Sequence, residues 1–325
     1  MTRFRFLALA AAAAALAWWA GPAAADYPDK PIRMVVPYVA GGNLDVIGRL
    51  FAQALTEELG QAVVVDNRPG ANGNTGTETV VRSPADGYTL AMVSAGTMAI
   101  NPSLYRGSMP FDPEKDLVAV SLVASGPMVL EVNAALPVRD VGELIAYARA
   151  NPGKLNFGSG GNGTLSHLSL EMLRARTGIN IVHVPYKGTS LAANDLLAGH
   201  IQGMFDTLST AAPLIKEGRI RGIAVTSAKR SQAMPALPTV GETGVKDYSA
   251  DAWSGLVAPA GTPREIVRRL QAAVARIAAR EQTQKRLAQV GSEAVGSTSE
   301  QFASIVRAER VRWAEIVKVS GARVD

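Results

Sequence analysis

Short apolar runs alternate with segments of helical periodicity along most of the chain. Ile32–Pro37 is a continuous apolar run, and Leu44–Leu59 carries apolar residues at helical spacing before Gly60 ends it. Similar apolar runs follow at 62–66, 89–93, 117–124, 129–132, 155–157, 179–184, 201–205 and 220–225. Runs that are apolar throughout, with helices between them, are typical of parallel strands buried on both faces. The pattern predicts an α/β fold with parallel sheets flanked by helices.

The C-terminal part has a different pattern. The segment 252–258 reads as one strand, and 263–321 reads as mostly helical. Thr262-Pro263-Arg264-Glu265 and Ser297-Thr298-Ser299-Glu300 both match the capping box that starts a helix. The sequence therefore predicts a helical C-terminal region after the last strand.

Residues 1–25 have the pattern of a secretory signal peptide. Arg3 and Arg5 precede an apolar run from Phe6 to Ala20, and the small residues Ala23-Ala24-Ala25 follow. A membrane anchor is the alternative, but about 15 apolar residues are fewer than the roughly 20 that span a bilayer. We expect cleavage after Ala25 and export to the periplasm. Cleavage lowers the formal net charge from +5 to +3, and we expect no nucleic-acid partner.

The composition excludes several kinds of chemistry. The chain has no cysteine and three histidines, which excludes disulfides, thiolate metal sites and cysteine nucleophiles. The sequence contains neither a G-x-S-x-G elbow nor a G-x-x-x-x-G-K-[ST] phosphate loop. We therefore expect no catalytic residues, no metal and no cofactor.

A first glycine-rich loop, residues 37–45, joins a predicted strand to a predicted helix. Its candidate ligand-binding residues are Tyr38, Gly41, Gly42, Asn43 and Asp45. Glycines allow the backbone to approach a ligand, and the N–H groups that open a helix have no partner inside it. Such a turn can bind a carboxylate or phosphate. An ordinary strand-to-helix turn is the alternative, and the geometry alone does not decide between them.

A second glycine-rich loop, residues 157–164, precedes another predicted helix. Gly158, Gly160 and Gly163 match G-x-G-x-x-G, and Ser159 and Thr164 add hydroxyl groups. A dinucleotide site also requires an acidic residue at the end of the next strand. That strand ends in His183-Val184-Pro185-Tyr186, with no Asp or Glu. We interpret the loop as an anion-binding site rather than a nucleotide site.

Further polar residues follow other predicted strands. Ser94 and Thr97 come after 89–93, Tyr186 after 179–184, and Asp206 after 201–205. Each alone is more often a turn residue, but the carboxyl ends of parallel strands form the ligand edge of an open sheet. We expect all four to line one cleft. His167 is expected to pack or cap locally.

Many ordered motifs resemble one family. Among them are Tyr27-Pro28-Asp29-Lys30-Pro31-Ile32, Asn67-Arg68-Pro69-Gly70-Ala71, Pro84-Ala85-Asp86-Gly87-Tyr88-Thr89, His183-Val184-Pro185-Tyr186-Lys187-Gly188 and Ala258-Pro259-Ala260-Gly261-Thr262-Pro263. Together with Gly41-Gly42, Asp45 and Gly163-Thr164, they resemble the substrate-binding proteins of tripartite tricarboxylate transporters, the Bug receptors. The resemblance covers essentially all of 27–325.

The resemblance implies a periplasmic-binding-protein fold of two domains joined by crossing hinge strands. It places domain 1 at 27–124 plus 252–325 and domain 2 at 125–251. It also implies that the two glycine-rich loops pinch a small carboxylate, which is delivered to membrane permease subunits by a monomeric receptor. Asn43 and Ser159-Gly160 depart from the family pattern, which has more hydroxyl residues there. That departure leaves the identity of the carboxylate open.

Two other functions use the same cleft. A periplasmic carboxylate sensor would present the ligand to a signalling partner instead of a permease. An exported enzyme on this fold would need a nucleophile or an acid–base pair, and the sequence shows neither.

Overall fold

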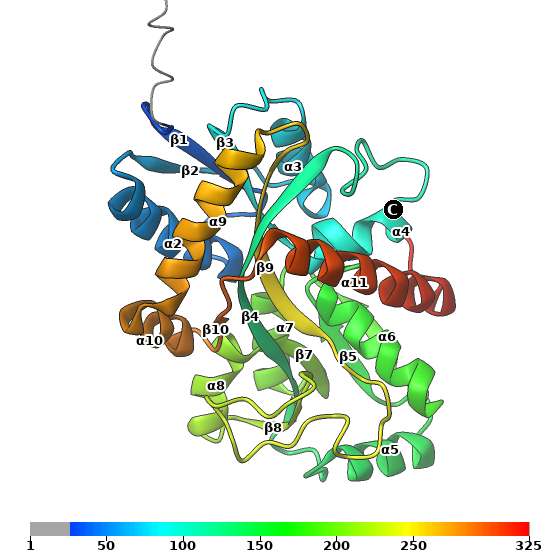
Figure 1. Cartoon of the computed structure of the whole chain (residues 1–325). Helices are drawn as coiled ribbons and strands as arrows, with labels where there is room; N and C mark the ends of the chain where they lie inside the picture. Colours follow the sequence, from blue (N-terminus) through cyan, green and yellow to red (C-terminus); the bar gives the residue numbers. More distant parts are fainter. Residues whose placement is uncertain (1–26, 325) are drawn as a thin grey trace, which may run out of the picture.

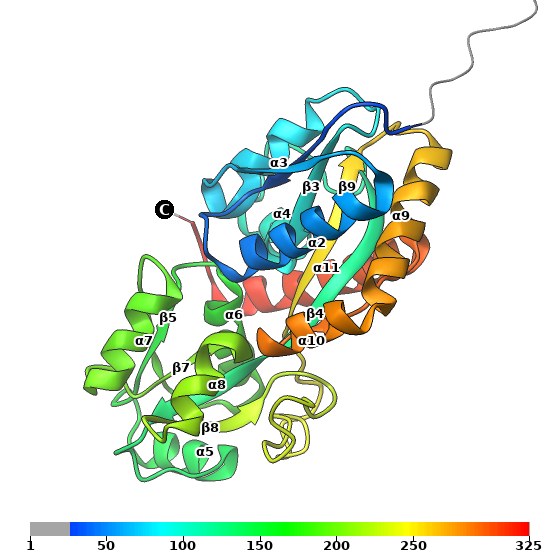
Figure 2. The same cartoon turned by 90° about the vertical axis from the view of Figure 1, so that its left-hand side faces the viewer.

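The computed structural model describes residues 27–324. The predicted signal peptide at 1–25 lies outside the described residues. Within 27–324, no helix combines the length and apolar character needed to cross a membrane. Two lobes, one above the other in Figure 1 and Figure 2, contain the described elements.

The first lobe is built on three parallel strands. These are β1 (Ile32–Val36), β2 (Val63–Asn67) and β3 (Thr89–Ser94), in the order β2-β1-β3. The helices of this lobe are α2 (Asn43–Leu59), α3 (Asn74–Val81), α4 (Asn101–Leu104), α9 (Arg264–Ala279) and α10 (Glu281–Gln289). A short 3-10 turn, η1 (Ala71–Gly73), and a π-helical turn, η2 (Gly96–Ile100), lie between them. Because the three strands are parallel, their carboxyl ends meet at one edge.

The second lobe repeats this plan. Its parallel strands are β5 (Asn156–Ser159), β6 (Val182–Pro185) and β7 (Gly203–Thr207), in the order β7-β5-β6. Strand β8 (Ile220–Val225) completes it, with α5 (Val141–Ala150), α6 (Leu165–Thr177), α7 (Thr189–Ala198) and α8 (Leu208–Lys216). The predicted α/β class, with mostly parallel sheets flanked by helices, is confirmed.

Two long strands run between the lobes. Strand β4 (Leu117–Asn133) pairs with β9 (Asp251–Pro259) over Leu117–Pro127, and then with β7 and β8. The sequence predicts two separate apolar stretches here, whereas the structure joins them into one strand. Gly126 lies within this strand at a point of close packing, because a Cβ there would lie 2.6 Å from the carbonyl oxygen of Gly291. These are crossing strands of the expected kind, while the domain boundaries stay a prediction.

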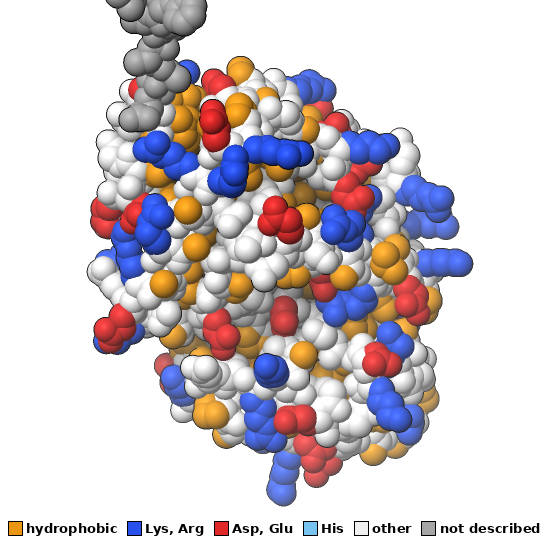
Figure 3. Space-filling view, viewed as in Figure 1, with side chains coloured by type: hydrophobic (Ala, Val, Ile, Leu, Met, Phe, Trp, Pro, Cys, Tyr) orange, Lys and Arg blue, Asp and Glu red, His pale blue; other side chains and the backbone are white. Residues whose placement is uncertain are grey.

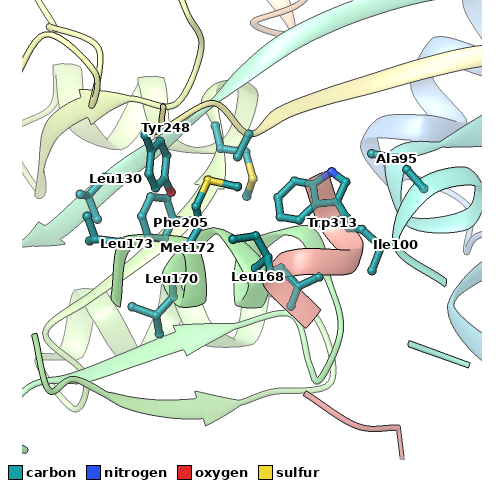
Figure 4. Close-up of a cluster of buried hydrophobic side chains, with 14 of the residues drawn as sticks. Ala95, Ile100, Leu130, Leu168, Leu170, Met172, Leu173, Phe205, Tyr248 and Trp313 are labelled. Atoms are coloured by element: carbon teal, nitrogen blue, oxygen red, sulfur yellow. The ribbon is translucent and has the colours of Figure 1, made fainter. Parts of the chain in front are cut away.

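The C-terminal helix α11 (Ser299–Ser320) connects both lobes. It packs against α6 in the second lobe and against η2 and α4 in the first. Figure 4 shows Trp313 beside Leu168 and Ile100, and the Trp313 side chain is fully buried. A short strand, β10 (Glu293–Ala294), precedes α11 and pairs with β4. The predicted helical C-terminal region is thus confirmed.

Some local predictions are corrected by the structure. The capping box expected at 262–265 does not form, because the Thr262 hydroxyl donates to the Pro259 carbonyl at 2.7 Å and Pro263 takes the N-cap. The second box forms one residue later than expected, between Thr298 and Gln301. The strand expected at 179–184 is β6, which begins only at Val182. The local sequence pattern alone does not determine the residue at which a helix or strand begins.

Candidate functional site

A cleft of about 340 Å³ lies between the lobes. Its lining residues come from both lobes and from the crossing strands. They are Tyr38, Val39, Gly42, Asn43, Leu44, Asn72, Ser94, Ala95, Gly96, Met128, Gly160, Thr164, Leu165, Ser166, Gly188, Thr189, Asp206, Thr207, Ala252, Trp253 and Ser254. Larger hollows of about 420, 430 and 670 Å³ lie elsewhere and touch neither glycine loop. We therefore take the cleft as the candidate site.

Four helices begin at this cleft. Their N-cap residues, Gly42 of α2, Thr164 of α6, Gly188 of α7 and Thr207 of α8, all line it. The first N–H groups of a helix have no partner inside the helix, and its N-terminus carries partial positive charge. Of the described residues that line the cleft, none is Lys, Arg or His. The cleft can therefore hold an anion through backbone N–H groups alone.

An ionised carboxylate holds the first loop. Asp45 is 2% exposed and accepts hydrogen bonds from Gly41 N and Arg49 Nε, each at 2.9 Å. Its second oxygen accepts from Asn67 Nδ2 at 2.8 Å. Burial raises the pKa of Asp45, but these donors outweigh burial and hold the pKa below its usual value. Asp45 thus fixes the turn at Gly41 from behind and does not line the cleft.

Tyr38, which also belongs to the first loop, is held through its hydroxyl group. Its hydroxyl donates to the carbonyl of Asn72 at 3.2 Å and lies within hydrogen-bonding distance of Ser94 Oγ at 3.1 Å and Thr97 Oγ1 at 3.3 Å. Burial raises the pKa of Tyr38, so the phenol is neutral. Thr97 is fully buried and contacts the Tyr38 hydroxyl from behind, whereas Tyr38 and Ser94 line the cleft.

Neutral acceptors hold the second loop. Gly160 N donates to Ser166 Oγ at 3.0 Å, Gly161 N to Ser159 Oγ at 3.1 Å, and Gly163 N to His167 Nδ1 at 3.0 Å. These three amides are therefore used inside the loop. The N–H groups that remain for a ligand are those opening α6, which belong to cleft-lining residues.

Gly163 fits where no other residue does. Its φ is +74°, in the left-handed region, and a Cβ there would lie 2.0 Å from Leu104 Cδ2 of α4. The second loop thus touches the first lobe closely at this point.

Asp206 is the charged side chain among the cleft-lining residues. It is 2% exposed, and its Oδ1 accepts from Thr207 N at 2.7 Å. Burial raises its pKa to about 6. Burial, followed by the charge of Asp206, also raises the pKa of Glu131, a buried carboxyl on the neighbouring strand β4. Within the described residues, Glu131 Oε2 has no hydrogen-bond partner. Both carboxyls favour the neutral state more than exposed ones do.

Seven of the residues predicted from sequence line the cleft, and six do not. The seven are Tyr38, Gly42, Asn43, Ser94, Gly160, Thr164 and Asp206. The six are Gly41, Asp45, Thr97, Ser159, Gly163 and Tyr186.

Five of the six residues outside the cleft support it from behind. Gly41, Asp45, Thr97, Ser159 and Gly163 carry the contacts described above. Tyr186 turns away, because its hydroxyl donates to Asp195 Oδ2 at 2.6 Å, and burial followed by Asp195 raises its pKa to about 12.

The candidate residues chosen from the sequence leave out part of the lining. Gly188 and Thr207 precede helices, and the same strand-to-helix argument that found the two loops could have found them. Trp253, from β9, stands out because it is 5% exposed and its Nε1–H has no partner within the described residues. No sequence pattern predicts such an unpaired donor. Within 27–324, no group of three or more His, Asp or Glu is placed to hold a metal ion.

The family is shown by comparison with known proteins. A model described as the tripartite tricarboxylate transporter family receptor matches residues 47–322. The chain belongs to this family. Protein BugT of Bordetella pertussis is 36% identical over 100% of both chains. A protein encoded in the tcbD-tcbE intergenic region of Pseudomonas sp. strain P51 is 37% identical over 90% of this chain and 86% of that protein.

Solved structures of similar proteins share the fold. Rpa4515 of R. palustris, determined with adipate, is 38% identical, with a TM-score of 0.83 over 92% of this chain and 99% of that one. MatC from Rhodopseudomonas palustris, determined with malate, is 29% identical, with a TM-score of 0.79 over 90% and 100%. The periplasmic binding protein BugD is 35% identical, with a TM-score of 0.79 over 91% and 99%. These family members and neighbours are binding proteins rather than enzymes.

Proposed function

We propose that the chain is a periplasmic receptor that binds a small carboxylate between its lobes and delivers it to a tripartite tricarboxylate-type permease. The convergence of four helix N-termini on the cleft carries this proposal. Their partial positive charges favour an anion without the strong grip of an arginine, so that the ligand can be released to a partner. The family and the adipate and malate complexes of its neighbours support the choice of a carboxylate.

Asp206, next to the N-cap of α8, favours a ligand that presents a hydrogen-bond donor to it. Asp206 repels a second carboxylate when it is ionised, whereas a hydroxyl or ammonium group would donate to it. We therefore expect an acid that bears such a donor, as malate does with its hydroxyl group, to bind more tightly than adipate, which has none. The residues that would contact it are the seven predicted residues that line the cleft, together with Trp253.

Binding and release would use the two lobes as moving bodies. We propose the boundaries 27–124 plus 252–325 and 125–251, with bending where β4 and β9 pass between them. Closure is favoured only by the extra contacts that the closed form makes with the ligand. No bond is made or broken in this cycle, and the receptor would act as a monomer.

The first experiment is a thermal-shift and calorimetric screen of adipate, malate and other small acids. Each acid is paired with its amide, which keeps the shape and removes the charge. Binding to the folded state raises the unfolding temperature, and only the acids should do so. If none of the acids binds while turnover of some substrate is detected, the receptor proposal fails.

Two variants at the first helix N-terminus test the mode of binding. Gly42 has an extended backbone with φ −75°, and a Cβ there meets only the Val39 carbonyl oxygen at 3.6 Å. Gly42→Asp and Gly42→Asn should both fold, because either residue is a good N-cap. The aspartate adds a negative charge beside the ligand and should weaken acid binding at least about tenfold more than the asparagine does. Equal affinity of the two variants would show that the anion does not bind at this helix end.

A further inference from the structure

Two histidines, one buried and one half-buried, lie stacked behind the second glycine loop. His167 belongs to α6 and is 6% exposed, and His183 belongs to β6. Their ring centroids are 3.8 Å apart, with an angle of 12° between the planes. Neither ring lines the cleft. Any effect of the pair on the cleft is therefore transmitted through the second glycine loop.

His167 holds the loop by accepting a hydrogen bond. Gly163 N donates to His167 Nδ1 at 3.0 Å, so this nitrogen carries a lone pair and the ring proton resides on Nε2. Nε2 lies 3.6 Å from Glu171 Oε1, and Glu171 in turn accepts from Arg174 at 2.6 Å. The contacts on both ring nitrogens thus specify one tautomer of neutral imidazole.

His183 holds the other end of the loop. Its Nε2 lies 2.6 Å from Ser159 Oγ, and the same hydroxyl oxygen accepts from Gly161 N at 3.1 Å. Ser159 is fully buried. Together the two rings anchor the loop before and after its tip.

The surroundings of the pair disfavour a proton on His183. Burial lowers the pKa of His183 to about 4, His167 and Arg174 act in the same direction, and Glu171 opposes them. These three groups all come from α6, while β5 contributes the uncharged Ser159. Two protonated rings at stacking distance would also repel each other.

We propose that His167 and His183 are positioning residues, which as a neutral stacked pair fix the second glycine loop in the shape that opens α6 toward the cleft. This proposal rests on the proposed function for its consequence on binding, but not for its effect on the loop. Leu165 and Ser166, the first residues of α6, then present their N–H groups to the ligand.

Loss of the acceptor at His167 should loosen the loop. Without a lone pair at the position of Nδ1, the N–H group of Gly163 has no partner inside the loop, so this hydrogen bond is lost. We expect such a change to weaken ligand binding.

Four variants separate positioning from packing. His167→Asn and His183→Gln each keep a hydrogen-bonding group near the nitrogen in use. His167→Leu keeps an apolar volume without an acceptor. His200→Asn is the matched control, since His200 is the third histidine of the chain and its side chain is 70% exposed.

The first readout needs no ligand. In wild type, ¹⁵N NMR should show His167 protonated on Nε2. His167→Leu should speed hydrogen exchange at the Gly163 amide about tenfold, the effect of one lost hydrogen bond, while His167→Asn restores slow exchange. Equally slow exchange in His167→Leu, or the opposite tautomer, would overturn the proposal.

The second readout is calorimetry with adipate and with malate at pH 7. His167→Leu should lower the affinity about tenfold, whereas His167→Asn, His183→Gln and His200→Asn should bind nearly as tightly as wild type. Wild-type affinity in His167→Leu would overturn the role of the pair in binding. Failure of both acids to bind wild type would count against the proposed function instead, and the exchange experiment would still decide what the pair does to the loop.

Discussion

The two glycine loops do the same job with different chemistry. The first is held by a charge, since Asp45 accepts from a backbone amide, an arginine and an asparagine. The second is held by neutral groups, since its amides donate to Ser159, Ser166 and an imidazole nitrogen. In both loops the helix N-termini stay free for the ligand. The two sets of hydrogen bonds, however, are lost under different conditions of pH.

The two sets of hydrogen bonds differ in their response to acid. The pKa of Asp45 lies below its usual value, so its contribution to stability is present above about pH 4 and is lost only as the pH falls through that lowered pKa. The pKa of His183 is lowered from 6.5 to about 4, so the folded state loses stability as the pH falls from about 6.5 to about 4. The second loop is therefore the acid-sensitive one.

The largest effect should come from removing the charged clamp. Asp45→Ala leaves Gly41 N and Asn67 without their acceptor and should lower the free energy of unfolding by about 3 kcal/mol. Urea unfolding measures this loss. The matched control is Glu281→Gln, which breaks an exposed i,i+4 pair with Lys285 and should cost less than about 0.5 kcal/mol. Similar losses in the two variants would mean that burial adds nothing to the clamp.

Substitution of a glycine should also cost a different amount of stability in each of the two loops. Gly41 and Gly163 both have positive φ, but a Cβ on Gly41 meets nothing within 4 Å, whereas one on Gly163 meets Leu104. Gly41→Ala should cost about 1 kcal/mol from backbone strain, and Gly163→Ala about 2 kcal/mol or more from strain and overpacking. A Leu104→Ala background should reduce the cost of Gly163→Ala only. Equal costs in both backgrounds would contradict the close contact between the lobes.

The sequence predicts much of the fold, but only part of the difference between the two glycine loops. The alternation of apolar runs and helices is local, so it predicts the strands and the two loops directly. The contacts of Asp45 with Asn67 and of Gly163 with Leu104 are not local, because each of these partners comes from another element. A glycine pattern can therefore indicate a ligand loop without showing which of its residues face the ligand. Ser159 illustrates this, since its hydroxyl turns inward to an imidazole 24 positions away.

A third prediction compares two buried aspartates. Asp206, with its pKa raised to about 6, stabilises the folded state only while it is neutral, so that its contribution is present below about pH 4 and is lost as the pH rises through 6. Asp206→Asn should therefore raise the free energy of unfolding at pH 7.5 by about 2 kcal/mol, below the limit of about 3 kcal/mol that the pKa shift sets, and leave it nearly unchanged at pH 4. The same substitution at Asp45 should lower it. Chemical unfolding at the two pH values measures both, and destabilisation by Asp206→Asn at pH 7.5 would contradict the assignment.

The smallest effect distinguishes the two tryptophans of the described chain. Trp313 Nε1 donates to Glu309 at 2.8 Å, whereas Trp253 lines the cleft with Nε1–H unpaired in the described residues. Trp253→Phe keeps the ring that packs edge-on against Phe302 and removes an unsatisfied donor, so the ligand-free protein should be as stable as wild type. If the ligand accepts from this N–H group, affinity for adipate or malate should fall about tenfold, as expected for one hydrogen bond to a charged group. Trp313→Phe should show the reverse, a less stable protein with unchanged affinity, because its N–H group already has a partner far from the ligand. Calorimetry measures the ligand affinity of both variants, and thermal unfolding measures their stability. Unchanged affinity in Trp253→Phe would show that Trp253 does not bind the ligand.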